Sequence, residues 1–371
     1  MSLPSRESGI GHELTIGFVR RGYSSGGGAE AYLKRVGAGI AAAGHRALLF
    51  TGPEWPADEW GFGEIRRVGW NSATAFADEL KTMNRGADTV LYSLERVWEC
   101  DVYRAGDGVH AAWLKRRDEF AGPVQRLARH FNRKHSATLA LEGSLFGGGA
   151  KRVIANSKMV KEEITRHYGY PADRIDVVYN GVPIVRVGPG GEDRAQTRAR
   201  MGLGDDDVAV LFAGSGWERK GLRFAIEAVE RQQKRVRFLV AGRGESRTFR
   251  SSRTQFLGVV REMASLYRAA DIFLLPTLYD PFSNACLEAL AAGKPVITTR
   301  ANGFSEIVEN ERHASILESP ADVDGISRAL QFWSDPAERS RAKMDNIALA
   351  AQFDISRNVA QTLEVLAKAR L

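Results

Sequence analysis

Short apolar runs that alternate with amphipathic stretches constrain the fold of this chain more than any other sequence feature. The apolar runs of the first half are residues 13–19, 46–51, 88–92, 152–155 and 175–179. Helical periodicity marks about 29–43 and 157–168 between them. Strands that alternate with helices in this way form βαβ units, so the pattern predicts a parallel sheet.

The alternation stops at Asn180-Gly181-Val182-Pro183 and resumes at residue 208, after a segment rich in Gly, Arg and Asp that is typical of a hinge. Further apolar runs cover 208–213, 236–241, 254–257, 272–275 and 295–298. Helical patterns begin near 220, 283 and 321, and a last one covers about 356–369. A chain of 371 residues is longer than a domain with a single hydrophobic core usually is. We therefore predict two Rossmann-like, doubly wound α/β domains, residues 1–183 plus 352–371 and residues 184–351, with a ligand cleft between them.

Composition narrows the class of protein. Apolar residues make up 44% and charged residues 26%, as in ordinary globular proteins. No run approaches the ~18 apolar residues of a membrane span, and the polar first residues lack a signal-peptide core, so we expect a cytoplasmic protein. Cys100 and Cys286 fall in different predicted domains, which favours two buried thiols over a disulfide or a zinc site. The net charge of +7 suits an anionic partner: nucleic acid, acidic lipid or a phosphorylated substrate.

Two glycine-containing loops of the second half suit a diphosphate ligand. In residues 211–221, Gly214 and Ser215 follow a predicted strand and let backbone amides approach a phosphate. Arg219 and Lys220 add two cations where the next helix begins. Arg243 lies in a similar turn, Gly242-Arg243-Gly244, after the next strand; a tight turn with solvated basic residues is the alternative for both loops.

The most informative segment is residues 279–297, where Glu288 follows Asp280 by eight positions. The amides of Phe282, Ser283 and Asn284 begin a predicted helix and can bind phosphate oxygens. Glu288, further along that helix, can accept hydrogen bonds from a ribose diol, and Asp280 can do the same for the hydroxyls of a sugar.

Together these segments resemble the retaining glycosyltransferases of family 4, which have the GT-B fold. The resemblance rests on the acidic-x7-Glu spacing, on the Ala-x-Gly-x-Pro-Val-Ile segment that follows it and on the Gly-Ser…Arg-Lys-Gly loop, and it continues more weakly into the first half. It implies that Arg219 and Lys220 neutralise the donor diphosphate and that Glu288 binds the ribose. Asp280 and the amides of residues 282–284 would hold the transferred sugar and the distal phosphate, and Val259 would lie against the nucleobase. The family usually has Glu where this chain has Asp280, which leaves the sugar open.

The first half contributes the loop that contains Gly27, Gly28 and Glu30. It resembles the family's Gly-Gly-x-Glu loop near the donor phosphate, and it lacks the Gly-x-Gly-x-x-Gly spacing of dinucleotide-binding proteins. In the segment from Asp101 to His110, Asp107 is our candidate for the residue that faces the transferred sugar. The context resembles members of the family that act on the lipopolysaccharide core, and His110 is the weaker candidate.

A basic segment with interleaved aromatic residues follows. Its predicted membrane or acceptor contacts are Trp113, Lys115, Arg116, Arg117, Arg126 and Arg129. Such a segment can lie on an anionic bilayer, or it can be a solvated helix face over a core stripe. Nucleic acid is disfavoured because no nucleic-acid motif accompanies the charge.

These expectations combine into one function: a metal-independent retaining transferase that moves a hexose, glucose from UDP-glucose, to a lipopolysaccharide-core or other lipid-linked acceptor at the membrane face. The acidic runs 205–207 and 322–324 are expected to serve as turns and caps, and no cofactor is expected. Transfer from a GDP- or ADP-sugar, epimerisation of a nucleotide sugar, and noncatalytic binding are the alternatives.

Overall fold

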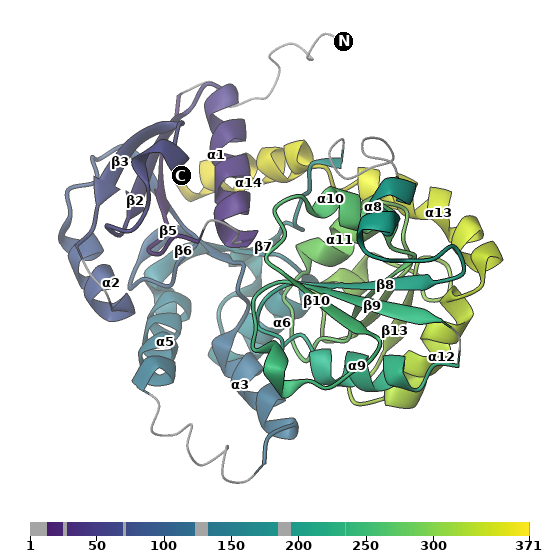
Figure 1. The fold of residues 1–371 in the computed structure, drawn as a ribbon. Coiled ribbons are helices and arrows are strands. Elements are labelled where there is room, and N and C mark those ends of the chain that lie inside the picture. The colour runs from purple at the N-terminus through teal and green to yellow at the C-terminus, as the bar shows by residue number, and fades with distance from the viewer. Residues whose placement is uncertain are drawn as a thin grey trace.

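The computed structural model describes residues 13–24, 28–69, 72–122, 133–184, 194–233 and 235–370. These residues form two lobes, each an α/β sandwich around one parallel sheet (Figure 1). The prediction of two Rossmann-like, doubly wound domains is confirmed.

The sheet of the first lobe has seven parallel strands in the order β3-β2-β1-β4-β5-β6-β7. Their bounds are β1 Thr15–Val19, β2 Arg46–Thr51, β3 Gly63–Arg67, β4 Thr89–Ser93, β5 Cys100–Ala105, β6 Ala150–Ala155 and β7 Ile175–Val177. The sheet of the second lobe has six parallel strands in the order β10-β9-β8-β11-β12-β13. Their bounds are β8 Val208–Ala213, β9 Val236–Ala241, β10 Thr254–Gly258, β11 Ile272–Leu275, β12 Val296–Thr299 and β13 Ala314–Leu317.

Helices cover both faces of each sheet. In the first lobe they are α1 Gly28–Ala42, α2 Ala73–Thr82, α3 His110–Glu119, α5 Arg133–Ser144 and α6 Lys158–Tyr168. In the second they are α8 Arg194–Arg200, α9 Leu222–Glu230, α10 Met263–Ala269, α11 Asn284–Ala291, α12 Val323–Trp333 and α13 Pro336–Ala351, and α14 Ile355–Arg370 ends the chain. The buried residues form one apolar cluster in the second lobe and one on each face of the first sheet.

The sequence prediction missed three strands, each of which is short or contains polar residues. β3 is an edge strand with the sequence Gly-Glu-Ile-Arg-Arg, so it has little apolar character. β5 contains Asp101 and Arg104, which interrupt its apolar run. β13 is a four-residue edge strand whose side chains are mostly half-buried. Short or polar strands are recognised by their partners rather than by their own sequence.

The chain returns to the first lobe near its end. The amide of Val182 donates to the carbonyl of Phe353 at 3.1 Å, and the amide of Ile355 donates to the carbonyl of Val182 at 3.2 Å. α14 then packs on α1 and on β4, β5 and β6 (Figure 1). The hinge therefore consists of two adjacent chain segments.

Several local expectations are confirmed. Asp207 closes a turn by accepting from the amide of Gly204, and Asp322 caps α12 by accepting from the amide of Gly325, at 2.8 Å in both cases. Cys100 and Cys286 are buried and unpaired.

Lys294 gives the fold a testable pH dependence. Its ammonium donates to the carbonyl of Arg268 at 3.1 Å. Burial, followed by repulsion from Arg194, lowers the pKa of Lys294 from 10.5 to about 7. Between these two pH values the unfolded chain binds a proton at this lysine that the folded chain does not, so this group's contribution to stability rises with pH.

We predict that Lys294→Met removes this dependence. Relative to the variant, the wild-type free energy of unfolding should rise from pH 7 toward pH 10, by at most about 1.4 kcal/mol per pH unit. Urea unfolding at several pH values measures the difference, with the exposed Lys151→Met as the control. Parallel curves for wild type and Lys294→Met would contradict the assignment.

Candidate active site

The predicted site residues of the second lobe gather at one edge of its sheet. The loops with Gly214, Arg243 and Asp280 follow β8, β9 and β11, which are parallel neighbours or next neighbours, so these loops meet beyond the carboxyl ends of the strands. Ligands of open α/β sheets bind at this edge.

Lys220 and Asp280 form the charged centre of this edge. The Lys220 ammonium lies 3.1 Å from Asp280 Oδ2, and both side chains are largely buried, with 12% and 8% exposure. Gly214, with φ of 134°, makes room for the lysine, because a Cβ atom there would lie 2.6 Å from Lys220 Cε. The backbone carbonyl of Arg219 accepts from the amide of Leu278 at 2.8 Å, which fixes the loop against β11. A phosphate that binds Lys220 would therefore also lie next to the Asp280 carboxylate.

The start of α11 is held by a buried asparagine that the sequence prediction missed. Ser283 caps the helix by accepting from the amide of Cys286 at 3.3 Å. Asn302 Oδ1 accepts from the amides of Ser283 and Phe304 at 3.2 and 3.1 Å. The Ser283 amide, which we predicted as a phosphate ligand, is therefore engaged within the protein in this structure.

The other predicted donor residues lie around this centre. The amide of Arg243 donates to Ser215 Oγ at 3.1 Å, and its guanidinium donates to Ser24 Oγ of the first lobe at 2.7 Å. Glu288 accepts from the hydroxyl of Tyr267 at 3.0 Å, and burial raises its pKa. Val259 follows β10 and is 55% exposed, so its side chain is open to a ligand.

Asp107 lies in a tight turn of the first lobe, after β5. Arg96 holds the turn in place by donating to the carbonyl of Gly108 at 2.8 Å. Glu142, which is fully buried, pairs with Arg96 and accepts from the amides of His110 and Ala111 at the start of α3. The Asp107 side chain itself is exposed. His110 instead contacts His135 at 3.0 Å, and burial followed by Arg96 lowers its pKa to about 4.

Tyr279 of the second lobe connects the two acidic loops. Its hydroxyl accepts from the amide of Val109 at 2.8 Å and donates to Glu163 of α6 at 2.7 Å. Gly108 permits this approach: it has φ of 71°, and a Cβ atom there would lie 2.3 Å from the Tyr279 hydroxyl. Because Tyr279 precedes Asp280 and Val109 follows the Asp107 turn, this contact fixes the spacing of the two carboxylates. We call it the tyrosine clamp.

A pocket of about 120 Å³ opens between the lobes next to the clamp. Its walls include Gly28 and Ala29 at the start of α1, Asp107 of the turn, and Phe282 and Asn284 at the start of α11. Glu30, in the first turn of α1, accepts from Arg20 at 3.1 Å. The predicted residues Gly28, Asp107, Phe282 and Asn284 thus line one pocket, and Gly27 lies outside the described residues.

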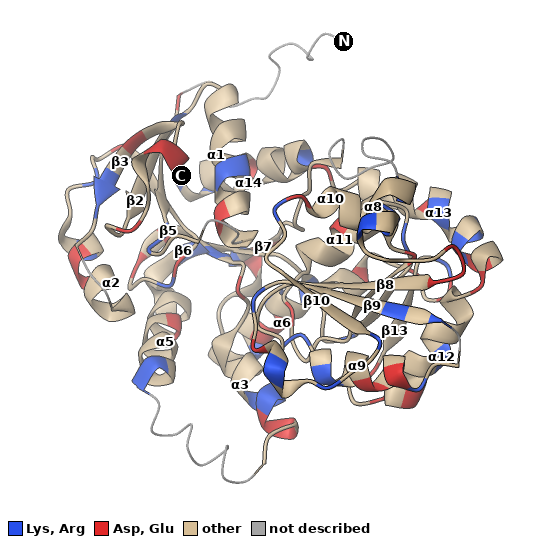
Figure 2. Cartoon of the chain, in the orientation of Figure 1, with Lys and Arg blue, Asp and Glu red and all other residues tan. Residues whose placement is uncertain are grey.

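The described part of the basic segment faces the second lobe. Trp113 stacks on Tyr279 with 6.4 Å between ring centroids, and Arg116 pairs with Glu163 at 3.0 Å. Arg117 pairs with Glu218 of the second lobe at 3.4 Å, and Lys115 is exposed. In Figure 2 the basic residues of α3 lie beside the second lobe. Protein partners thus contact the indole and two of the cations, and the predicted bilayer contact stays a prediction. Arg126 and Arg129 lie outside the described residues.

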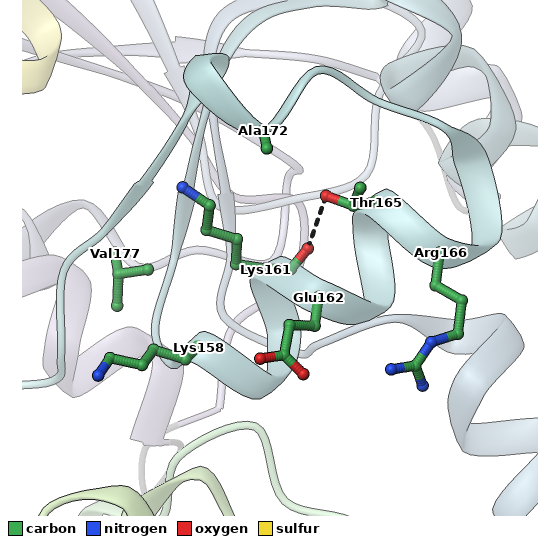
Figure 3. A pocket seen from close by; sticks show the side chains of 7 residues that line it. All are labelled: Lys158, Lys161, Glu162, Thr165, Arg166, Ala172 and Val177. Carbon is green, nitrogen blue, oxygen red and sulfur yellow. Dashed lines mark hydrogen bonds between the residues drawn. The ribbon is translucent and has the colours of Figure 1, made fainter.

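A larger hollow of about 610 Å³ lies elsewhere, on the outer side of α6 (Figure 3). It is bounded by Lys158, Lys161 and Arg166 of α6 and by Ala172 and Val177. Lys161 is already bonded to the carbonyl of Ile175 at 2.9 Å. None of the predicted site residues lines this hollow, whereas several line the smaller pocket. The smaller pocket is therefore the candidate active site.

Sequence reasoning missed the residues that position the others. Tyr279 stands next to Asp280, but its residue type does not indicate a contact across the lobes. Arg104 stands in the Asp107 segment, where nothing indicates its hydrogen bond to Asn180. Asn180 was interpreted only as a break in the pattern, whereas its amide donates to the carbonyl of Phe282 at 3.1 Å. Buried polar contacts between distant segments leave no local signal.

Two family models match the chain. The model described as Glycosyltransferase Family 4 matches residues 26–186, and that described as Glycosyl transferases group 1 matches residues 207–334. A probable transglycosylase from Burkholderia thailandensis is 31% identical over 371 residues, 96% of this chain and 98% of that protein. The chain belongs to glycosyltransferase family 4. An uncharacterised glycosyltransferase from Methanocaldococcus jannaschii is 30% identical over 201 residues, 49% of this chain, and this match spans about half of the relative, 51%.

Solved structures show the same fold. WaaG, a glycosyltransferase involved in lipopolysaccharide biosynthesis, superposes with a TM-score of 0.80 at 19% identity and covers 95% of this chain and 99% of its own. HepE from Anabaena, solved with UDP and glucose, has a TM-score of 0.73 at 18% identity over 96% of this chain and 100% of its own. The chain is thus a family-4 glycosyltransferase with the GT-B fold.

Two further observations concern the described ranges alone. No group of three or more His, Cys, Asp or Glu side chains gathers there in a way that suits a metal ion. No helix in these ranges has the length and apolar character that crossing a bilayer requires.

The tyrosine clamp yields a prediction. Tyr279→Phe leaves the buried Val109 amide without a partner and removes one hydrogen bond of Glu163, whose other carboxylate oxygen still pairs with Arg116. This should cost about 1–3 kcal/mol in the free energy of unfolding. In a double-mutant cycle with Glu163→Gln, the two changes should couple by about 0.5–3 kcal/mol. Urea unfolding measures both quantities.

Tyr170→Phe is the matched control, because its hydroxyl bonds to the Ala150 carbonyl at 2.9 Å within the first lobe. It should show no coupling to Glu163→Gln. Additive effects of Tyr279→Phe and Glu163→Gln would contradict the clamp.

Proposed function

We propose that the chain transfers a hexose from a nucleoside-diphosphate sugar, with UDP-glucose as the donor, and retains the configuration of the anomeric carbon. The observation that carries the proposal is the buried Lys220–Asp280 pair at the carboxyl edge of the second sheet, beside the start of α11. A cation, a carboxylate and a helix start within one loop cluster suit a diphosphate joined to a sugar. HepE, which was solved with UDP-glucose, has the same fold and supports this choice of donor.

The donor would lie mainly on the second lobe. Lys220 and Arg219 would neutralise the diphosphate as negative charge develops on the leaving group, a role that needs no divalent ion. Asp280 would accept hydrogen bonds from the sugar hydroxyls, and Glu288 from the ribose. The exposed Val259 would cover one face of the nucleobase.

The reaction would proceed on one face of the sugar. The bond between the anomeric carbon and the diphosphate oxygen breaks, and the bond to the acceptor oxygen forms on the same face, which retains the configuration. The acceptor proton passes to the departing diphosphate. Asp107, on the opposite lobe, would orient the acceptor hydroxyl and stabilise the oxocarbenium-like centre. Closure of the cleft would exclude water and so favour transfer over hydrolysis.

The acceptor would bind the first lobe, and we propose a lipid-linked sugar of the lipopolysaccharide-core type. The fold shared with WaaG supports this choice at the level of architecture. The enzyme would then work at the cytoplasmic face of a membrane. The exposed Lys115 is the described residue of the basic segment that is left to face an anionic surface.

The donor is tested by thermal-shift titration with UDP-, GDP- and ADP-sugars in the presence of EDTA. We predict that UDP-glucose raises the melting temperature selectively, because binding to the folded state alone stabilises it by about 2.7 kcal/mol at a hundredfold excess over Kd. Selective stabilisation by a GDP- or ADP-sugar would reject the UDP donor. No response to any sugar nucleotide would reject the enzymatic proposal.

Two variants separate binding from chemistry. Lys220→Met should weaken donor binding and lower turnover by roughly 10²–10³-fold, because it removes charge stabilisation of the leaving group. Asp107→Asn should leave donor affinity nearly unchanged while lowering the rate of transfer. Titration calorimetry with UDP-glucose and a UDP-release assay distinguish the two, and wild-type rates in both variants would refute the catalytic assignment.

A further inference from the structure

Glu306 of the second lobe caps a helix of the first lobe. Its carboxylate accepts from the amides of Lys158 and Met159, at 2.8 and 2.7 Å, in the first turn of α6. The helix's own cap residue, Ser157, accepts only from the amide of Val160, at 3.2 Å. Amides of a first helical turn have no partner within the helix, and a carboxylate there is also favoured by the helix dipole. We call this contact the Glu306 cap.

The loop that carries Glu306 also braces the carboxylate of the donor edge. The amide of Asp280 donates to the carbonyl of Ala301 at 2.9 Å. The amide of Gly303 donates back to the carbonyl of Asp280, also at 2.9 Å. The loop of residues 301–306 is therefore joined to Asp280 by two backbone hydrogen bonds, and the two cannot shift independently.

The lobes meet closely at this loop. A Cβ atom on Gly303 would lie 2.5 Å from Ser157 Cβ of the first lobe and 2.0 Å from the carbonyl oxygen of Pro281. The same helix, α6, supplies Glu163 to the tyrosine clamp beside the Asp107 turn. α6 is thus held at its first turn by the loop that braces Asp280, and further along by the residue before Asp280.

Glu306 is not among the described residues that line the pocket between the lobes, so it acts through the position of other groups. We propose that Glu306 is a positioning residue for transfer, whose cap on α6 sets the distance between Asp107 and Asp280. The inference rests on the proposed function, in which these two carboxylates face the acceptor and the transferred sugar. Because the donor contacts belong to the second lobe, loss of the cap lowers turnover and leaves donor affinity in place.

Glu306→Gln tests the role of the cap. The variant keeps the size of the side chain but removes its charge, and its NH2 group cannot accept from a backbone amide. Turnover of UDP-glucose with a lipopolysaccharide-core acceptor should fall by at least about tenfold, while the Kd for UDP-glucose changes by less than about threefold. A UDP-release assay and titration calorimetry measure the two quantities. Glu309→Gln is the matched control, because Glu309 is exposed and pairs with Arg312 within the second lobe.

Lys158→Pro removes the same contact from the side of the first lobe. Proline is accepted at the first position of a helix, where it lacks only an amide that the helix does not use. Ser157 before it has extended backbone, with φ of −159° and ψ of 162°, as a residue before proline requires. Lys158→Ala, which keeps the amide, is the reference for the loss of the side chain. Combined with Glu306→Gln, the proline should lower turnover by less than the product of the two single effects.

Amide exchange measured by NMR in the ligand-free protein reports on the cap without any donor. The amides of Lys158 and Met159 should be protected in wild type, although first-turn amides of a helix normally exchange freely. Both should exchange at least about tenfold faster in Glu306→Gln and as in wild type in Glu309→Gln. Unprotected amides in wild type would overturn the cap itself.

Lower turnover at unchanged donor affinity in Glu306→Gln, with faster exchange at both amides, supports the proposal. Turnover that matches Glu309→Gln, or an equal loss of donor affinity and turnover, would overturn the positioning role. Multiplicative effects of Glu306→Gln and Lys158→Pro would also overturn it. If Glu306→Gln misfolds, Lys158→Pro against Lys158→Ala decides in its place. Failure of UDP-glucose to bind wild type rejects the proposed donor alone, because turnover is then measured with the sugar nucleotide that raises the melting temperature, and the exchange measurement needs none.

Discussion

The parallel arrangement of every strand in both sheets is the constraint on which the rest of the structure depends. In open α/β sheets, ligands bind in the crevice outside the carboxyl ends of the parallel strands. The two lobes bring these ends together, so Asp107 after β5 and Asp280 after β11 approach from opposite sides. The tyrosine clamp uses this geometry. A tyrosine can bond the backbone next to Asp107 only because Gly108 has no side chain.

A second contact between the lobes supports the first. Glu306 of the second lobe accepts from the amides of Lys158 and Met159, at 2.8 and 2.7 Å, in the first turn of α6. The same helix supplies Glu163 to the tyrosine clamp. Both contacts are therefore made by α6. A movement of the second lobe relative to the first must either break these hydrogen bonds or move α6 together with the second lobe.

The sequence predicts the fold well because its main signals are local. The strands β2, β8, β9 and β11 are strongly apolar, and their predicted bounds agree with the structure. The phosphate-type loops are recognisable for the same reason, since glycine, basic residues and a helix start are neighbours in the chain. Which residues hold these loops in place is not a local property. The contacts of Tyr279 with Val109 and Glu163 span 170 and 116 residues, and no periodicity records them. In the basic segment, charge and aromatic residues led to the prediction of a bilayer contact, which stays a prediction. Their sequence did not indicate that Trp113 stacks on Tyr279 of the second lobe or that Arg116 pairs with Glu163 of α6.

Hydrogen–deuterium exchange with and without UDP-glucose locates the donor on the molecule. We predict slower exchange in residues 214–221 and 280–288, at the carboxyl edge of the second sheet, with a smaller effect at the start of α1. Protection confined to residues 158–177, around the hollow on the outer side of α6, would contradict it, as would unchanged exchange throughout.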